Sequence, residues 1–435
     1  MWINVGNDGL SAGMAKWTSL AFSPSGEPFV AYEDYGNGQK ATVMKFNGTN
    51  WVNVGAAGFS DGSVECVSLA FSPSDGQPYV GYMDFANAQK ATVMKFNGTN
   101  WVHVGNAGFS SAGVVYTSLA FSSSGMPYLA YSDIGNSFKA TVMKFDGMSW
   151  VNVGSAGFTV TGAEYTSLAF SPSGKPYLAF NDDQFPTWGK ASVMKFDGSN
   201  WLYIGNPGLS NDRSEWTCLA FSQSDENPYV AYRDFWNNAS VTVMKFDGSN
   251  WMLVGNAGFS SDDVGHPSLA VSPSDDHPYV AYEDGGNSWK ASVMKFDGTN
   301  WVNIGNAGFT TGSVGCTSLA FSPSGQPYIA FFDNADSAYA KVMKYDSVYL
   351  GIDKWQNSQL SPFPNPTSKL ITFDFKNLSG KCNKIEIVDL KGVRIFEAQI
   401  KERKLVLNIE NFPAGIYIVK VTTETKNWFG KFCKD

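Results

Sequence analysis

The chain has 435 residues and a formal net charge of −8, and this charge is unevenly distributed. Residues 1–347 contain 17 Lys and Arg against 30 Asp and Glu (net −13), whereas residues 348–435 contain 14 against 9 (net +5). Phosphate binding depends on clustered Lys and Arg, so the acidic part argues against nucleic acid as a partner. No stretch is long and apolar enough to form a transmembrane helix.

The first part of the chain is an internal repeat with a period of about fifty residues. A Trp-x-x-(Val/Ile)-Gly phrase begins at seven tryptophans: Trp2, Trp51, Trp101, Trp150, Trp201, Trp251 and Trp301. Each phrase is followed by the same three β-rich runs, and helix-period runs are absent. Repetition at this period is typical of a solenoid, a propeller or an array.

Four strands are expected in each unit. In the first complete unit they cover 18–23, 29–34, 41–46 and 51–55, with a tight turn at 24–26. The second strand is apolar on both faces, as expected for a strand buried between neighbouring sheets. Four antiparallel strands repeated radially predict the blades of a β-propeller.

Both ends of the repeat region are incomplete in a complementary way. The chain opens on a fourth strand at 2–6, and its last copy stops after a third strand at 341–345. We therefore predict an all-β fold, a seven-bladed β-propeller over residues 1–347 closed by the N-terminal strand. An open β-solenoid is the alternative, and it would leave both ends unpaired.

Residues that recur in every copy are interpreted as scaffold. The Trp of the fourth strand is expected to pack one blade against the next. An Asp ends the second strand in every copy: Asp34, Asp84, Asp133, Asp182, Asp234, Asp284 and Asp333. A Lys marks the third strand equally regularly, beginning with Lys45. A catalytic residue is needed once, so a sevenfold Asp is interpreted as a turn-stabilising or cross-strand partner, with a ring of weak sites as the alternative.

Variation between the copies is confined to one face of the predicted ring. Antiparallel connectivity places the second-to-third and fourth-to-first loops together, and these loops differ between copies. Fifteen residues after each Trp, just before the expected inner strand, one position reads Trp17, Cys66, Tyr116, Tyr165, Trp216, His266 and Cys316. This position is expected to surround the mouth of the central channel. Functional residues on rigid scaffolds usually lie in such loops.

Aromatic platforms beside a few acids and amides suit sugar recognition, because a pyranose presents one apolar face and several hydroxyls. The candidate ligand-binding residues are Trp17, Tyr116, Tyr165, Trp188, Trp216, Arg233, Trp236, His266 and Trp289. In the alternative interpretation these aromatics only plug the channel mouth, and the propeller is a protein-interaction or adhesion module.

Catalysis is not expected. The three histidines lack metal-ligand spacing, and no Gly-x-Ser-x-Gly elbow occurs. A carboxylate pair such as Glu164 with Glu215 keeps a polysaccharide-active enzyme open as a further alternative. No cofactor or metal is expected, because the five cysteines form no metal motif. Cys382 and Cys433 could form a disulfide in an exported protein.

The tail differs from the repeats. Pro364-Asn365-Pro366 is followed by alternating strands, an Asp389-x-x-Gly392 turn and the hairpin sequence at 413–419 (Pro-Ala-Gly-Ile-Tyr-Ile-Val). These motifs predict a small Ig-like β-sandwich over 360–435, joined to the propeller by a linker at 348–359. In order and spacing they resemble the type A C-terminal sorting domain of the Bacteroidetes type IX secretion system. The repeats resemble uncharacterised bacterial repeat β-propellers, which implies no activity.

The resemblance implies that residues 360–435 are recognised by the outer-membrane translocon, so that the protein is secreted or attached to the outer-membrane surface. Family members also carry an N-terminal export signal. No signal peptide is visible before the first repeat, so we expect the sequence to be a truncated, mature or fragment form of an exported protein. The preferred interpretation is an exported propeller that binds a glycan or another surface polymer through its variable face.

Overall fold

The computed structural model describes residues 1–7, 9–183, 189–346, 360, 362–375, 382–389, 394–400, 402–423 and 427–435. The chain separates into two compact units, Met1–Tyr345 and Asp346–Asp435. The expected linker at 348–359 lies outside the described residues.

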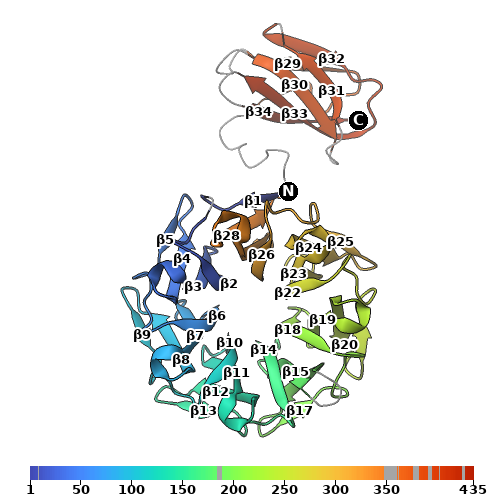
Figure 1. Ribbon diagram of the computed structural model, residues 1–435. Coiled ribbons are helices and arrows are strands. Elements are labelled where there is room, and N and C mark those ends of the chain that lie inside the picture. Colours follow the sequence, from blue (N-terminus) through green and yellow to red (C-terminus); the bar gives the residue numbers. More distant parts are fainter. Residues whose placement is uncertain are drawn as a thin grey trace. The chain divides into compact units, whose positions relative to one another are not determined.

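The first unit is a ring of seven four-stranded antiparallel sheets, which confirms the predicted propeller (Figure 1). The innermost strands are β2 (Ala15–Phe22), β6 (Val64–Phe71), β10 (Val114–Phe121), β14 (Gly162–Phe170), β18 (Ser214–Phe221), β22 (Val264–Val271) and β26 (Val314–Phe321). The second strands are β3 (Pro28–Asp34), β7 (Pro78–Asp84), β11 (Pro127–Asp133), β15 (Pro176–Asp183), β19 (Pro228–Asp234), β23 (Pro278–Asp284) and β27 (Pro327–Asp333).

The outer half of each blade is built from two further strands. The third strands are β4 (Lys40–Phe46), β8 (Lys90–Phe96), β12 (Lys139–Phe145), β16 (Lys190–Phe196), β20 (Ser240–Phe246), β24 (Lys290–Phe296) and β28 (Tyr339–Tyr345). The fourth strands are β5 (Trp51–Asn53), β9 (Trp101–His103), β13 (Trp150–Asn152), β17 (Trp201–Tyr203), β21 (Trp251–Leu253), β25 (Trp301–Asn303) and β1 (Trp2–Asn4).

The N-terminal strand closes the ring, as predicted. β1 pairs antiparallel with β28, and Trp2 lies opposite Tyr345. Trp2 Nε1 also donates a 2.7 Å hydrogen bond to the carbonyl of Ile304 in the neighbouring blade. Pairing the first strand with the last blade leaves neither end of the array with an unsatisfied sheet edge.

The repeated tryptophans join each blade to the next. Trp101 Nε1 donates to the carbonyl of Val54 at 2.6 Å, and its ring stacks on Phe59 at 4.2 Å. The second strands are buried on both faces; every residue of β3, for example, is buried. Aromatic stacking and apolar burial between blades therefore form the core, distributed around the ring rather than collected in one place.

The recurring Asp and Lys are structural, as interpreted from the sequence. The Asp34 carboxylate accepts hydrogen bonds from Thr42 and Asn37, both at 2.8 Å, and ties the second strand to the third and to the loop between them. Lys45 on the third strand pairs with Glu27 at 3.2 Å.

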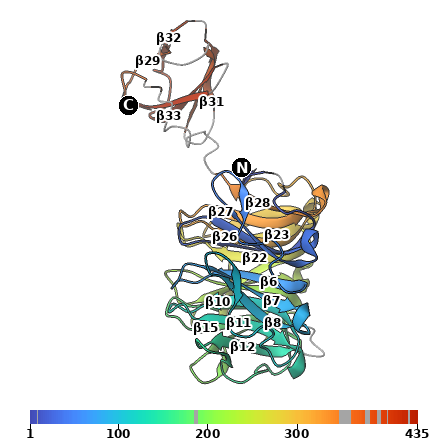
Figure 2. The same cartoon turned by 90° about the vertical axis from the view of Figure 1, so that its left-hand side faces the viewer.

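Two sets of loops share the variable face, which Figure 2 shows edge-on. The second-to-third loops contain the 3-10 turns η1 (Tyr35–Asn37), η2 (Phe85–Asn87), η3 (Ile134–Asn136), η4 (Phe235–Asn237), η5 (Gly285–Asn287) and η6 (Asn334–Asp336). Their backbones bond to the fourth-to-first loops, for example Phe85 N to Ser63 O at 3.1 Å. We call this side the variable-loop face.

The second unit is a small β-sandwich, as predicted. One sheet contains β30 (Cys382–Asp389), β31 (Arg394–Gln399), β33 (Gly415–Thr423) and β34 (Asn427–Lys434). The other contains β29 (Leu370–Asp374) and β32 (Lys404–Asn408). The two sheets enclose an apolar core that includes Phe373, Ile385 and Phe432.

The disulfide considered between Cys382 and Cys433 is not formed. Cys433 is a free thiol. Along β33, Cys382 pairs with Thr423 and Cys433 with Ile416, seven residues away. At roughly 3.3 Å per residue these positions lie far beyond the ~7 Å Cα separation that a disulfide can span.

Candidate functional site

A β-bulge in each inner strand turns one side chain toward the centre of the ring. In β2, Lys16 pairs with Glu33 and Ser19 pairs with Ala31, so Trp17 and Thr18 together oppose a single residue. The first bulge residue has a positive φ in every blade: Trp17 (52°), Cys66 (52°), Tyr116 (54°), Tyr165 (50°), Trp216 (52°), His266 (36°) and Cys316 (53°). Bulges re-aim side chains, and positive φ is uncommon for bulky residues.

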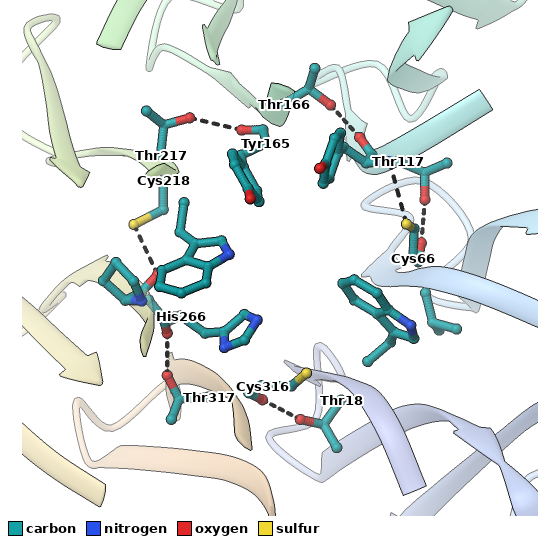
Figure 3. A pocket seen from close by; sticks show the side chains of 16 residues that line it. Thr18, Cys66, Thr117, Tyr165, Thr166, Thr217, Cys218, His266, Cys316 and Thr317 are labelled. Atoms are coloured by element: carbon teal, nitrogen blue, oxygen red, sulfur yellow. Dashed lines mark hydrogen bonds between the residues drawn. The ribbon is translucent and has the colours of Figure 1, made fainter. Parts of the chain in front are cut away.

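These seven residues, which we call the pocket ring, line one cavity of about 230 Å³ at the centre of the propeller (Figure 3). The sequence prediction of a ring of these side chains around the channel is therefore confirmed in placement. One detail was wrong: the ring lies inside the inner strand, not before it. The strand starts at Ala15, because its first residues pair with β3 before the bulge.

Hydrogen bonds between blades hold the pocket ring in place. The hydroxyl of Thr217 donates to the carbonyl of Tyr165 at 2.8 Å, and that of Thr317 donates to the carbonyl of His266 at 2.6 Å. Equivalent bonds run from Thr18, Thr117 and Thr166 to the ring residue of the preceding blade. Five of the seven positive-φ carbonyls are thus satisfied by the next blade, which helps to fix the aim of those ring side chains.

One side of the pocket is a continuous run of rings. Tyr116 and Tyr165 have centroids 4.6 Å apart, Tyr165 meets Trp216 edge-on at 6.1 Å, and Trp216 stacks on His266 at 4.5 Å. We call these four residues the aromatic arc. Burial raises the pKa of Tyr165 and that of Tyr116, so both phenols remain protonated and can donate hydrogen bonds.

The opposite side of the pocket is formed by Trp17 between two thiols. Cys66 and Cys316 flank Trp17 in the order of the blades, and both are free thiols. Burial raises the pKa of Cys66 to about 11 and that of Cys316 to about 12. These thiols stay protonated, so they act as packing groups rather than as nucleophiles.

His266 is oriented by a buried acid. Its Nδ1 lies 2.7 Å from Glu283 Oε1, and the same oxygen accepts a 2.8 Å bond from the backbone N–H of Cys316. Glu283 is 8% exposed. With Nδ1 engaged by the carboxylate, Nε2 is the ring nitrogen left for a ligand.

Arg233 is held at the edge of the site rather than inside it. Two hydrogen bonds join its guanidinium to Asp263, Nε to Oδ1 at 2.9 Å and Nη2 to Oδ2 at 2.7 Å. Nη1 donates to Glu215 at 2.9 Å, and the guanidinium lies 5.0 Å from the Trp216 ring centroid. Arg233 thus supports Trp216, which itself lines the pocket. In the considered carboxylate pair, Glu215 is ion-paired with Arg233 and also with Arg213.

A second buried acid lies in the first blade. Glu33 is 4% exposed. Burial and the neighbouring Glu65 raise the pKa of Glu33 to about 7, while Lys16 lowers it. No hydrogen bond or ion pair joins its carboxyl to another side chain among the described residues. It is therefore a proton-sensitive group close to the ring.

The remaining candidate residues lie away from the pocket. Trp236 in η4 and Trp289 after η5 are 66% and 42% exposed and belong to the second-to-third loops. Phe85, Ile134 and Phe138 are exposed on corresponding loops of other blades. Trp188 lies outside the described residues. The predicted set thus divides into five pocket-ring residues, the supporting Arg233 and two surface tryptophans.

Two buried acids were missed in the sequence. Glu33 and Glu283 occupy the position just before the recurring Asp, where the other blades have Met83, Ser132, Asn181, Arg233 and Phe332. Only Arg233 was singled out there. The variation of this otherwise buried position between copies was the available signal, because strand register places it beside the residue that precedes the pocket ring.

The described part of the chain contains neither a metal-binding cluster nor a membrane-spanning helix. There, no group of three or more His, Cys, Asp and Glu could hold a metal ion. Its helical segments are three-residue turns, and none could cross a bilayer.

Comparison with known proteins identifies the second unit. A family model described as the secretion system C-terminal sorting domain matches residues 361–435. These residues are a type IX sorting domain. The sorting domain makes the protein an exported one, secreted or attached to the cell surface.

Similarity to known proteins and solved structures supports the propeller fold of the first unit. A segment of 78 residues is 32% identical to the ulvan lyase NLR42 of Nonlabens ulvanivorans, covering 18% of this chain and 14% of the lyase. PorZ, a surface component of the type IX secretion system of Porphyromonas gingivalis, matches all of this chain and 61% of its own, with a TM-score of 0.53 and 15% identity. A PL25 ulvan lyase matches 79% of this chain and 95% of its own, with a TM-score of 0.52 and 11% identity. Identities this low show the fold alone, and the matched segment of NLR42 is too short to carry the lyase activity to the propeller.

Proposed function

We propose that the propeller of this exported protein binds a glycan or another surface polymer, with one sugar unit seated in the central pocket. The aromatic arc carries the proposal. Four rings on four successive blades form one wall of a single cavity, and their phenol, indole and imidazole groups place polar atoms beside apolar faces. Ligand pockets typically combine an aromatic lining with a few placed polar groups.

The rigidity of the pocket supports the same proposal. Each ring side chain is fixed by a bulge and, at five of the blade junctions, by a Thr hydroxyl from the next blade. A preformed wall loses little conformational entropy when a ligand binds, so more of the contact energy appears as affinity.

The exposed tryptophans extend the proposed binding surface. Trp236 and Trp289 belong to adjacent blades on the variable-loop face, outside the cavity. A polymer with one unit in the pocket would continue across this face and stack on them. With 66% and 42% of their surfaces exposed, both rings are accessible to such a ligand.

The test is binding of the full-length protein to immobilised glycans, with Trp216→Ala as the key variant. We expect it to lower retention at least tenfold, because an aromatic truncation at a pocket wall removes a stacking surface and typically costs more than about 1.4 kcal/mol. Met148→Ala is the matched control, since Met148 is 90% exposed and lies in a third-to-fourth turn on the opposite face. Retention unchanged in Trp216→Ala would refute binding at this site.

A polysaccharide-active enzyme is the second candidate. His266 with Glu283 has the geometry of a carboxylate-oriented imidazole, an arrangement suited to general acid–base chemistry. New chain ends appearing when the protein is incubated with the polysaccharide it retains, and absent in His266→Gln, would establish catalysis. Retention of the polymer without new ends would instead support a binding module.

A further inference from the structure

We infer that the central pocket accepts an uncharged sugar residue and discriminates against saccharides that carry carboxylate or sulphate groups. The inference rests on the proposed function and names the ligand class of the same site. It follows from where the positive charges around the pocket are held.

The pocket lining itself contains no fixed positive charge. Among the described residues, those around the cavity are aromatic rings, threonines, thiols and small apolar groups, and His266 is the single basic side chain. Its Nδ1 is already paired with the Glu283 carboxylate. An anionic group entering this cavity would lose water without gaining a cationic partner, which is unfavourable.

The arginines nearest the arc are occupied by acids. Asp263 engages Arg233 with two hydrogen bonds, and Glu215 engages it with a third. Arg213 also pairs with Glu215, and its guanidinium lies 4.5 Å from the Phe235 ring centroid. Bidentate pairs of this kind are the strong class of charged hydrogen bonds. The Arg233 guanidinium is therefore committed to protein carboxylates, whereas Arg213, whose side chain is 49% exposed, pairs with Glu215 through one nitrogen and does not line the pocket.

On the rim of the pocket opposite the aromatic arc, the positive charge is also engaged by neighbouring groups. The ammonium group of Lys16 lies 5.1 Å from the Tyr35 ring centroid, and its bond to Tyr35 raises the pKa of Lys16. The two acids nearby, Glu33 and Glu65, outnumber this single cation. With a net charge of −13 over residues 1–347, the surrounding potential also disfavours an approaching polyanion.

The size of the cavity limits what enters. Its volume of about 230 Å³ lies below the roughly 300–1,000 Å³ of pockets for drug-sized ligands. One sugar ring, rather than a longer segment, is the unit that fits. The arc supplies a stacking surface, and the phenols of Tyr116 and Tyr165 with His266 Nε2 supply hydrogen-bonding groups for its hydroxyls.

The test is retention of the full-length protein on an array that carries neutral oligosaccharides beside their uronic-acid and sulphated counterparts. We expect neutral members of matched pairs to be retained at least tenfold better, with the difference persisting at 0.5 M NaCl, where long-range charge effects are screened. Equal or better retention of the anionic members would overturn the inference while leaving glycan binding intact. No retention of any glycan would remove the inference together with the proposed function.

A gain-of-function variant tests the mechanism. Asp263→Asn weakens the hold on Arg233, so retention of the anionic members should rise about threefold from one added net charge near the pocket. Glu215→Gln releases the same guanidinium and serves if the first variant folds poorly. Asp75→Asn is the control, because it removes the same charge from an ion pair with Lys95 on the opposite face. No rise in either variant, or an equal rise in the control, would overturn the role assigned to these acids.

Discussion

Trp2 and Ile304 are joined by a 2.7 Å hydrogen bond although 302 residues separate them in the chain. The Trp2 ring also stacks on Phe309 at 4.7 Å and is 7% exposed. The matching Trp-to-carbonyl hydrogen bond at every other blade junction lies within a continuous chain. Only at this junction does the Trp also hold a chain terminus in the ring.

Trp2→Ala should therefore both destabilise the propeller and release its N-terminal strand. Truncating a buried Trp typically costs about 3–5 kcal/mol. Trp301→Ala removes the matching bond to Val254 and stacking on Phe259 inside the chain. Thermal unfolding should show a comparable loss for both variants, whereas hydrogen exchange should show unprotected amides in β1 only for Trp2→Ala. Equal protection of β1 in the two variants would contradict the closing role of Trp2.

Lys341 lies at a position on the third strand where the other six blades have Thr or Ser, and this difference gives a second prediction. It is 8% exposed and pairs with Asp333 at 3.1 Å and Asp336 at 3.3 Å. The corresponding Thr42 donates to Asp34 instead. Lys341→Met should destabilise by about 3–5 kcal/mol, because it leaves a buried carboxylate unpaired. Lys341→Thr should lose much less, since its hydroxyl can donate to Asp333 as in the other blades. Chemical unfolding compares the two, and equal losses would contradict the expectation that a hydroxyl donor can replace the Lys341 ammonium beside Asp333.

Glu33 makes stability depend on pH. Its pKa is raised from 4.5 to about 7 by burial and by Glu65. A carboxyl with a raised folded-state pKa binds its proton more tightly in the folded protein than in the unfolded chain. The protonated Glu33 therefore adds to the free energy of unfolding, fully below pH 4.5, and this stabilisation is lost as the pH rises to about 7.

Glu33→Gln should remove this loss, because the amide imitates the protonated acid. At pH 8 the variant should be more stable than the wild type by on the order of 1–3 kcal/mol, since one pKa unit corresponds to about 1.4 kcal/mol. At pH 4 the two proteins should differ little. Urea unfolding at pH 4, 6 and 8 measures the difference, and a gap that does not grow with pH would contradict the assignment.

The fold was predictable from the sequence because each strand and turn pattern occurs in several copies, and each copy supports the same prediction. The orphan strand at Trp2 and the unfinished last copy together determined the closed ring. The pocket ring was found by its fixed offset from each Trp. Its bulge was missed, since the Gly- and Ser-containing stretch before Trp17 resembles a loop although Ala15 and Lys16 already pair with β3.

The network around the pocket could not be derived in the same way. Arg233 was noticed as a unique residue, but its partner Asp263 belongs to the loop leading to the next blade, thirty residues away. Nothing in the local pattern of either residue indicates that pair. It depends on how far the chain rotates from one blade to the next, which the repeat period alone does not give.

The sorting domain gives a prediction independent of the propeller's ligand. A reporter protein that carries an N-terminal export signal and is fused before residues 360–435 should reach the cell surface in a bacterium that has a type IX system, and should be retained inside when that system is inactivated. Surface labelling with a protease or an antibody measures the outcome. The propeller fused to the same reporter without residues 360–435 is the control, and its export would contradict the role of the sorting domain.

Variants of the exposed tryptophans distinguish binding in the pocket alone from binding along an extended surface. If a polymer continues from the pocket across the variable-loop face, Trp236→Ala with Trp289→Ala should weaken binding of a long polymer by about tenfold, because each lost aromatic contact is worth on the order of 0.5–1.5 kcal/mol. Binding of a short oligosaccharide that fills only the pocket should be unchanged. Both side chains are largely solvent-exposed, so the variants should unfold at nearly the wild-type temperature. Isothermal titration with ligands of increasing length distinguishes the cases. An equal loss for short and long ligands would place these rings at the pocket itself, and no loss for either would leave them without a part in polymer binding.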